Sequence, residues 1–342
     1  MQSLRRVLED RLSAAAIALI AGSAAAQEYS FRFQSSDPAG NPNFVMQQKW
    51  TEIVAEKTDG AIEIELLPVE SLVAHNETQD AIAAGILDGH ITDVSYFAGK
   101  DPAFGLIANP VGAYSDPQEM FDFIYEGGGM ELMRELEAPY GLQFIGPTSP
   151  GLEAFVSKVP LEGVADLQGL KLRAPEGLVQ NVFAAAGAAP VNLPGSEVFT
   201  SLDKGVIEAA DYNVFSTNQA QGLHDVATHP VYPGFHSLPL IEISMSKAKW
   251  DELSPELQTA LEESVKEFGQ LQTATVKEKD EEAVAAAKAG GKITVHDWSA
   301  EERAKFREIA MGEWEKVAAR SENAQKVYDT LVAYLKDKGL MN

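Results

Sequence analysis

The sequence of 342 residues contains no cysteine, so it has neither disulfide bonds nor cysteine metal ligands. Positive charge is scarce, because 27 Lys and Arg stand against 51 Asp and Glu and give a formal net charge of -24 at pH 7. A surface with this excess of acid repels nucleic acids and anionic membranes. Stability must therefore come from a buried hydrophobic core, and a chain of this length can supply one in two lobes.

Motifs of enzyme chemistry are also missing. The six histidines show no metal-binding spacing, and neither His-Glu-x-x-His nor Gly-x-Ser-x-Gly occurs. The run Gly127-Gly-Gly129 is not followed by Lys-Ser/Thr, so it is no phosphate-binding loop. Paired acids such as Glu281-Glu282 fall on helical patterns, where such pairs are solvated. These absences favour a binding protein over an enzyme.

Long apolar runs are absent except near the start of the chain. Arg5-Arg6 precedes an apolar stretch from Ala14 to Gly22, and Ala24-Ala25-Ala26 follows it. A basic head, a short apolar segment and small residues are the layout of a secretory signal peptide. We expect residues 1–26 to be removed by cleavage near Ala26 and the remaining protein to be exported.

Hydrophobic periodicity predicts two α/β lobes. The first part of the chain alternates strand and helix, at residues 29–34, 43–58, 61–67, 76–85 and 91–97. Residues 100–104 and 109–112 are expected as loops. A helix over 116–136 is interrupted at its triple glycine. After strands at 142–149 and 152–159, which we expect to pair with each other, the same alternation returns at 170–174, 177–187, 189–193, 195–205 and 207–215. A short sequence pattern occurs twice, from Ala84 to Asp93 and from Lys204 to Asp211. Each segment has a glycine, two aliphatic residues and an acid where a helix ends and a strand begins.

The end of the chain is expected to join the two lobes. Residues 226–247 read as an extended return strand at a hinge, and 250–288 as a long helix running along both lobes. Further helices follow from Ser299, where Glu302 completes a capping box, and over 323–338. We place lobe I at 27–150, completed by about 237–275, and lobe II at 151–236, completed by about 276–335. The expected fold class is α/β, with two lobes and the ligand cleft between them.

Arg173 is the candidate around which the cleft is organised. Leu170, Leu172 and Ala174 alternate with Lys171 and Arg173, which predicts a short half-buried strand that ends at the mouth of the cleft. A guanidinium offers five donors in a planar fork that fits a carboxylate, and it keeps its charge. The plainer alternative is an arginine held by one of the many acids of this chain.

Several stretches together resemble a known family. They are Asp166-Leu-Gln-Gly-Leu-Lys-Leu-Arg-Ala-Pro175, Pro190-Val-Asn-Leu-Pro194 with Glu197, and Gly205-Val-Ile-Glu208. The chain resembles the DctP-type solute-binding subunits of tripartite ATP-independent periplasmic (TRAP) transporters. It resembles in particular their 2-oxo acid binding branch, through Gly99-Lys-Asp-Pro-Ala-Phe104, Gly127-Gly-Gly-Met-Glu-Leu-Met-Arg-Glu135 and Tyr232-Pro-Gly234.

The resemblance implies a two-lobed periplasmic-binding-protein fold of type II-like plan. It also implies a periplasmic receptor that captures a small organic anion, a carboxylate such as a 2-oxo or hydroxy acid, by lobe closure. It would deliver this ligand to the TRAP membrane permease subunits. The implied binding residues are Arg173 on the carboxylate, with further contacts from Asp211, Tyr212, Asn213, Phe235, Gln34, Asn43, Tyr96 and Glu153. The rival readings are a receptor for an ATP-driven importer or a sensor, and an exported enzyme on the same two-lobed fold.

The sequence departs from that branch where the branch holds a cation beside its ligand. Gly151, Leu152 and Ser237 stand in those places and lack the oxygen ligands that sodium or calcium prefers. Glu153 lies one residue away and could restore one ligand. We therefore expect no cofactor and no metal site, although a cation bridging the ligand stays open. A monomer and a homodimer formed through the C-terminal helices also both stay open.

Overall fold

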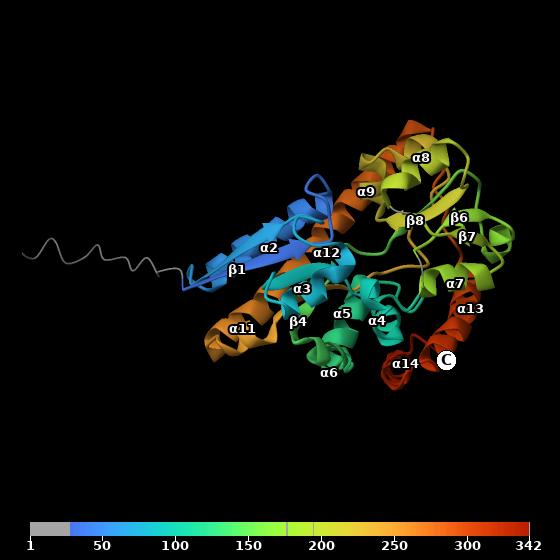
Figure 1. Ribbon diagram of the computed structural model, residues 1–342. Helices are drawn as coiled ribbons and strands as arrows, with labels where there is room; N and C mark the ends of the chain where they lie inside the picture. The colour runs from blue at the N-terminus through green and yellow to red at the C-terminus, as the bar shows by residue number, and fades with distance from the viewer. Residues whose placement is uncertain (1–27, 176, 194, 342) are drawn as a thin grey trace, which may run out of the picture.

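The structure is a computed structural model that describes residues 28–341 apart from 176 and 194, so the expected signal peptide lies outside the described residues. It contains two separate β-sheets, each in its own lobe (Figure 1). The sheet of lobe I has the order β2-β1-β3-β9-β4. Its strands are β1 Tyr29–Ser35, β2 Ile62–Leu67, β3 Gly89–Asp93, β4 Leu142–Thr148 and β9 Ile241–Ser246.

The sheet of lobe II repeats this plan on a smaller scale, with the order β5-β8-β6-β7. Its strands are β5 Ala154–Ser157, β6 Lys171–Arg173, β7 Ala189–Val191 and β8 Ala209–Asn213. In lobe I, β1 pairs in parallel with β2 and β3, and β9 runs antiparallel to β3. In lobe II, β6 pairs in parallel with β7 and β8, and β5 runs antiparallel to β8. The repeated strand and helix pattern in the sequence thus corresponds to a repeated sheet.

Helices cover both sheets and join them. The α-helices of the first half are α2 Pro42–Lys57, α3 Thr78–Ala83, α4 Pro102–Ala108, α5 Pro117–Glu126 and α6 Gly129–Glu137. Those of lobe II are α7 Leu178–Ala185, α8 Val198–Asp203, α9 Phe215–Ala220 and α10 Leu223–Val226. The last are α11 Lys247–Asp251, α12 Pro255–Gly290, α13 Ala300–Ala318 and α14 Glu322–Asp337. Short 3-10 helices include η1 His75–Glu77, η2 Val94–Phe97, η3 Ala138–Tyr140, η4 Val164–Leu167 and η5 Gly195–Glu197.

The long helix α12 runs behind both lobes (Figure 1), as the sequence predicted. It packs against α2 and β4 of lobe I and against α9 of lobe II. The helix α13 makes a second bridge, because it contacts both α7 and α4. In the part of the chain that the structure describes, no helix combines the length and the apolar character needed to cross a bilayer.

Three local expectations are wrong. The strand expected over 91–97 ends at Asp93, and the next residues form the 3-10 helix η2, whose first turn is capped by the Asp93 side chain. The segment expected as a loop near residues 100–104 begins helix α4, capped by Asp101. Finally, β4 and β5 do not pair with each other, since β4 pairs with β9 in lobe I and β5 with β8 in lobe II. The chain therefore changes lobes between these two strands, at residues 149–153.

A capping box has two reciprocal hydrogen bonds, and at Ser299 only one of them forms. Ser299 accepts a hydrogen bond from the Glu302 backbone N–H at 3.2 Å, and α13 begins there. The Glu302 carboxylate instead accepts from the Val164 N–H at 2.8 Å, in lobe II. Glu302 therefore ties the start of α13 to the neighbouring loop rather than closing its own turn.

Candidate functional site

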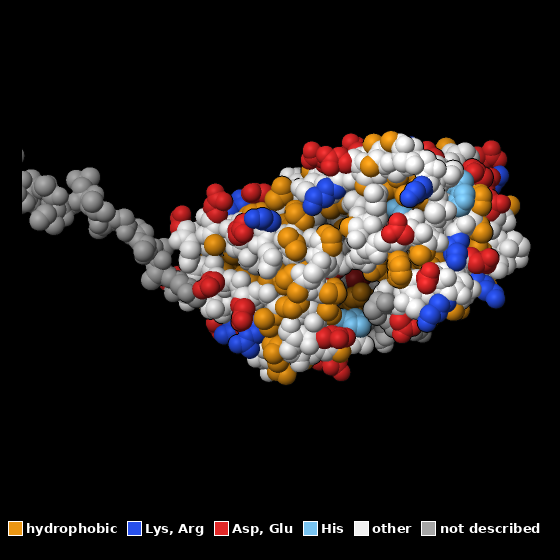
Figure 2. All heavy atoms as spheres, turned by 90° about the horizontal axis from the view of Figure 1, so that it is seen from above, with side chains coloured by type: hydrophobic (Ala, Val, Ile, Leu, Met, Phe, Trp, Pro, Cys, Tyr) orange, Lys and Arg blue, Asp and Glu red, His pale blue; other side chains and the backbone are white. Residues whose placement is uncertain are grey.

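A hollow lies between the two lobes and consists of two adjoining compartments (Figure 2). The first, of about 130 Å³, contains Arg173 and is called the Arg173 compartment here. The second, of about 110 Å³, contains Asp37 and is called the Asp37 compartment. Both are bounded by the same five residues, Asp93, Tyr96, Glu153, Tyr212 and Pro239. In the space-filling view an acidic side chain lies recessed in the hollow. The two compartments form one cleft.

Arg173 is held at the end of β6 by backbone carbonyls. Its Nε donates to the Leu193 carbonyl at 3.1 Å, and Nη1 donates to the Asp211 carbonyl at 2.7 Å. Among the residues that the structure describes, Nη2 has no hydrogen-bond partner and the guanidinium forms no ion pair with an acid. The neighbouring strand and loop therefore fix the orientation of the guanidinium and leave donors for a ligand in the cleft.

Two aspartates at strand ends form the acidic wall of lobe I. Asp37 follows β1 and accepts a hydrogen bond from Gln47 Nε2 at 2.9 Å, and Asp93 ends β3 and accepts from the Ser95 N–H at 2.7 Å. Burial raises the pKa of Asp37 to about 6, despite the hydrogen bond from Gln47. Burial likewise raises the pKa of Asp93 to about 6, and the nearby Asp211 adds to the effect. The cleft therefore destabilises the charged form of both groups.

Three further side chains lie close together in the cleft region. They are Glu153, directly before β5, Asp211 on β8, and His236. The ligand atoms of these side chains all lie within 4.8 Å of one another, and Asp211 Oδ1 is 3.5 Å from His236 Nε2. Burial and the adjacent charge of Asp211 raise the pKa of Glu153 well above its usual value. Burial also acts to raise the pKa of Asp211, but His236 outweighs it and holds that pKa below its usual value. Glu153 therefore holds a proton more tightly than Asp211 does.

The structure brings most of the predicted site residues into this cleft. Those that line it are Asn43, Tyr96, Glu153, Arg173, Asp211, Tyr212 and Asn213. The Tyr212 hydroxyl donates to Gln221 Oε1 at 2.6 Å, which fixes the ring at the boundary of the two compartments.

Two predicted site residues lie elsewhere. Phe235 is 6% exposed and stacks on Trp298 with ring centroids 3.8 Å apart, so it belongs to the aromatic core below lobe II. Gln34 is fully buried, and its amide donates to the Val73 carbonyl at 2.8 Å and accepts from the Leu72 N–H at 2.9 Å. Gln34 therefore holds the loop after β2 and does not line the cleft.

The sequence reasoning missed three residues that matter in the cleft. Asp37 and Asp93 both stand at the carboxyl ends of parallel strands, which is where ligands bind in open α/β sheets. That rule could have singled them out. His236 gave no such signal, because it lies in an irregular segment and reaches Asp211 only through the return of the chain between the lobes.

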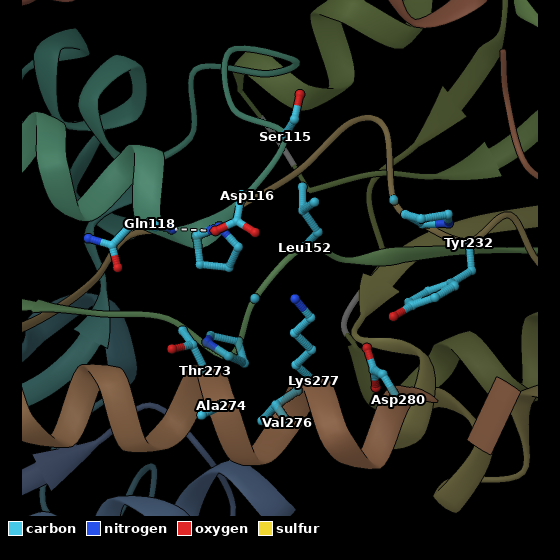
Figure 3. Close-up of a pocket in the computed structure, with 15 residues that line it drawn as sticks. Ser115, Asp116, Gln118, Leu152, Tyr232, Thr273, Ala274, Val276, Lys277 and Asp280 are labelled. Atoms are coloured by element: carbon cyan, nitrogen blue, oxygen red, sulfur yellow. Dashed lines mark hydrogen bonds between the residues drawn. The ribbon is translucent and has the colours of Figure 1, made fainter. Parts of the chain in front are cut away.

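A larger hollow of about 340 Å³ lies behind the crossing point of the lobes, between α12 and the connecting segments (Figure 3). Lys277 of α12, Tyr232 and Asp116 are among the residues that border it. Its lining draws on none of the strand carboxyl ends, and Arg173 does not border it. We therefore place the candidate site in the cleft.

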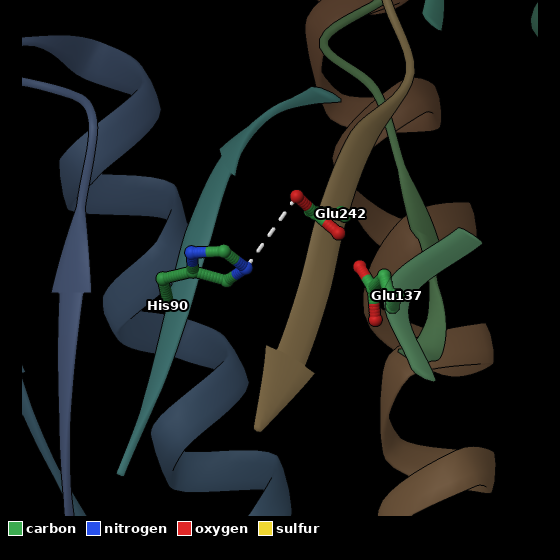
Figure 4. A group of neighbouring side chains, drawn as sticks. All are labelled: His90, Glu137 and Glu242. Atoms are coloured by element: carbon green, nitrogen blue, oxygen red, sulfur yellow. Dashed lines mark ion pairs between the residues drawn. The ribbon is translucent and has the colours of Figure 1, made fainter. Parts of the chain in front are cut away.

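A second buried group of acids lies inside the lobe I sheet (Figure 4). His90 Nε2 is 3.4 Å from Glu242 Oε1, and Ser244 Oγ is 2.8 Å from Glu137 and 3.0 Å from Glu242. Burial and the adjacent Glu242 raise the pKa of Glu137 well above its usual value. These side chains are fully buried between β3, β9 and α6, so this group links elements of one lobe and does not face the cleft.

The cation site that the resemblance implies would fall on other side chains here. Calcium takes six to eight oxygen ligands, and sodium also prefers oxygen. Glu153 and Asp211 supply carboxylate oxygens and His236 supplies a nitrogen, with the ligand atoms of all three within 4.8 Å of one another. Leu152 borders the hollow behind the hinge, which leaves Glu153 as the residue that reaches the cleft.

Two α/β lobes with a repeated sheet, a bridging helix and a polar cleft between strand ends define a solute receptor of the two-lobed class. Residues 33–321 match the family described as bacterial extracellular solute-binding protein, family 7. A crystal structure of a TRAP periplasmic solute-binding protein from Rhodobacter sphaeroides, in an apo open form, is similar with 70% identity and a TM-score of 0.82. It covers 91% of this chain and 99% of that one. The chain belongs to the DctP-type family of TRAP periplasmic solute-binding proteins.

More distant relatives have names that include their ligands. A monocarboxylate 2-oxoacid-binding periplasmic protein of Nostoc is 27% identical over 90% of this chain and 84% of its own length. The 2,3-diketo-L-gulonate-binding periplasmic protein of Escherichia coli is 27% identical over 86% of this chain and 88% of its own. Family membership confirms the expectation of a periplasmic binding protein rather than an enzyme.

Proposed function

We propose that this protein captures a small carboxylate in the cleft and delivers it to the membrane subunits of a TRAP transporter. The observation that carries the proposal is Arg173, whose guanidinium is fixed by two carbonyls while Nη2 stays without a partner among the described residues. The names of both distant relatives refer to carboxylic acids, which supports the same ligand class. A fixed guanidinium binds a carboxylate with little loss of side-chain entropy.

Lobe closure supplies the remaining affinity. A charge-assisted hydrogen bond contributes about 1.5–3 kcal/mol, whereas micromolar binding needs about 8 kcal/mol. Residues of lobe I, such as Asn43 and Tyr96, face the same cleft as Tyr212 and Asn213 of lobe II. A ligand that contacts both walls favours the closed form, and the permease then recognises that form.

The test is calorimetry on Arg173→Ala, with pyruvate, lactate, succinate, glycine betaine and 4-aminobutanoate as probes. Whichever probe binds the wild type should bind the variant at least about tenfold more weakly, the loss of one charge-assisted pair. Lys171→Ala is the matched control, because Lys171 lies on the same strand β6 but does not line the cleft. Unchanged affinity in Arg173→Ala would remove the arginine from its role.

A further inference from the structure

The charges in the cleft do not match a simple anion. One fixed guanidinium, that of Arg173, shares the cleft with the carboxyl groups of Asp37, Asp93, Glu153 and Asp211. Among the described residues, neither Asp37, Asp93 nor Glu153 lies within ion-pair distance of a Lys, Arg or His. Asp211 pairs with His236 only. A ligand with only negative charge would add to this excess of acid.

The guanidinium lies toward one end of the cleft. Arg173 and Asp211 border only the Arg173 compartment, and Asp37 borders only the Asp37 compartment. Asp93 and Glu153 line the boundary that the compartments share. The Asp37 compartment is therefore lined by carboxyl groups and, among the described residues, by no Lys, Arg or His, whereas the Arg173 compartment combines one guanidinium with acids.

Unmet hydrogen-bonding capacity points the same way. Asp211 is 2% exposed and lines the Arg173 compartment, yet within the described chain its Oδ2 has no hydrogen-bond partner. A buried carboxylate oxygen without a partner is costly, and either a donor on the ligand or the proton of the adjacent Glu153 would satisfy it. Asp37 and Asp93 accept hydrogen bonds from neutral donors only, Gln47 and the Ser95 N–H.

Two aromatic rings flank the boundary between the compartments. Tyr96 and Tyr212 line both of them. Tyrosine faces attract cations, most strongly where water is excluded. Rings at this boundary suit a cationic nitrogen that lies next to Asp93 and is carried by the same molecule as the carboxylate on Arg173.

We propose that the ligand is a zwitterion, with its carboxylate on Arg173 and a cationic nitrogen among Asp37, Asp93 and the rings of Tyr96 and Tyr212. This inference rests on the proposed function and narrows its ligand class to amino acids, betaines and related molecules. The ligand itself then supplies the second positive charge that the cleft lacks, and no metal ion has to supply it.

Isosteric pairs of probes test the charge directly. In each pair a carbon replaces the cationic nitrogen and the shape stays close: glycine betaine with 3,3-dimethylbutanoate, 4-aminobutanoate with pentanoate, and L-proline with cyclopentanecarboxylate. Calorimetry at pH 7.5 in a chelating buffer should show at least one zwitterion binding tenfold or more tightly than its nitrogen-free analogue. The raised pKa values of Asp37 and Asp93, about 6, leave both carboxylates ionised at this pH.

Variants of the two lobe I aspartates then test which residues cause the preference for a zwitterion. Asp37→Asn and Asp93→Asn should each reduce the affinity ratio of the pair at least about threefold. Asp203→Asn is the matched control, because it removes an equal charge from the exposed end of α8, away from the cleft, and should leave the ratio unchanged.

The other outcomes overturn the inference in distinct ways. If the simple acids bind as tightly as the zwitterions and depend on Arg173, carboxylate capture stands and the zwitterion does not. If the simple acids bind only after calcium or sodium is added, a metal ion supplies the second charge and the inference is wrong. If none of the six probes binds but pyruvate, lactate or succinate does and depends on Arg173, the inference fails and the proposed function stands. If none of these nine molecules binds, both fail.

Discussion

Gln34 in lobe I and Arg173 in lobe II occupy the same place in two similar sheets. Gln34 on β1 is in register with His90 of β3, and Arg173 on β6 is in register with Ala210 of β8. Each side chain hydrogen-bonds the loop that follows the next parallel strand, Gln34 at Leu72 and Val73 and Arg173 at Leu193. Gln34 and Arg173 thus hold equivalent loops in the two lobes. Only Arg173, in lobe II, also presents a charge to the cleft.

The neighbouring strands β3 and β8 also end in different residues, but here the charged residue belongs to lobe I. β3 ends in Asp93 and β8 ends in Asn213, each the fifth and last residue of its strand. Both line the Asp37 compartment. Lobe I therefore contributes a carboxylate where lobe II contributes an amide, and lobe II contributes a guanidinium where lobe I contributes an amide. The two lobes therefore share one sheet plan and differ in the residues at equivalent strand ends.

The largest expected effect concerns the aromatic core of lobe II rather than its cleft. Phe235→Ala should lower the free energy of unfolding by about 3–5 kcal/mol, because it removes a ring packed on Trp298 and Phe306. Urea unfolding measures this loss. Ligand affinity per folded molecule should stay within about twofold of the wild-type value. A large loss of affinity in a fully folded variant would mean that Phe235 contributes to ligand binding.

Arg173→Gln makes lobe II resemble lobe I at the equivalent position. The amide can still donate to one of the two carbonyls, but the charge is gone, so affinity for a carboxylate should fall by about 1.5–3 kcal/mol, or roughly 10- to 150-fold. Calorimetry gives the affinity and thermal unfolding checks the fold. A variant that binds like the wild type would mean that the two positions are equivalent in function as well as in structure.

Gln34→Ala tests whether the equivalent residue of lobe I has a structural role but no role in ligand binding. The change leaves the Leu72 N–H and the Val73 carbonyl without their partner, so stability should fall by about 1–3 kcal/mol. Urea unfolding is the measurement, with ligand affinity as the control. The comparison breaks down if affinity falls tenfold while stability is unchanged.

The smallest effect expected is that of Asp93→Asn on stability. Burial raises the folded-state pKa of Asp93 to about 6 from 3.8, so the folded state holds this proton more tightly than the unfolded state does. The stabilisation is complete below about pH 3.8 and is lost as the pH rises through about 6. The asparagine variant should therefore be more stable than the wild type at pH 7 and should differ little from it in stability at pH 4.

Urea unfolding of both proteins at the two pH values measures this difference. Asn213→Asp would be the complementary change, since it gives lobe II the carboxylate of lobe I and should lower stability at pH 7 without a comparable cost at pH 4. Equal stability differences at the two pH values would show that the Asp93 carboxyl is not destabilised in its charged form.

The sequence alone determined the local elements and the two-lobed class. Alternating apolar residues mark β1, β2 and β6, and cap residues and glycines mark the ends of α5 and α6, because these signals act over a few neighbours along the chain. The strand end that carries Arg173 could be predicted for the same reason. The resemblance to a family added Asp211 and Tyr212, which local patterns do not distinguish.

Only the tertiary structure decided which strand pairs with which and what the cleft contains. The chain changes lobes between β4 and β5, and His236 meets Asp211 through a return segment far along the sequence. Phe235 and Gln34 turned inward because rings and backbone groups of distant segments surround them. Charge balance in a cleft is a sum over residues from both lobes, so the excess of carboxylates around Arg173 appears only once the chain is folded.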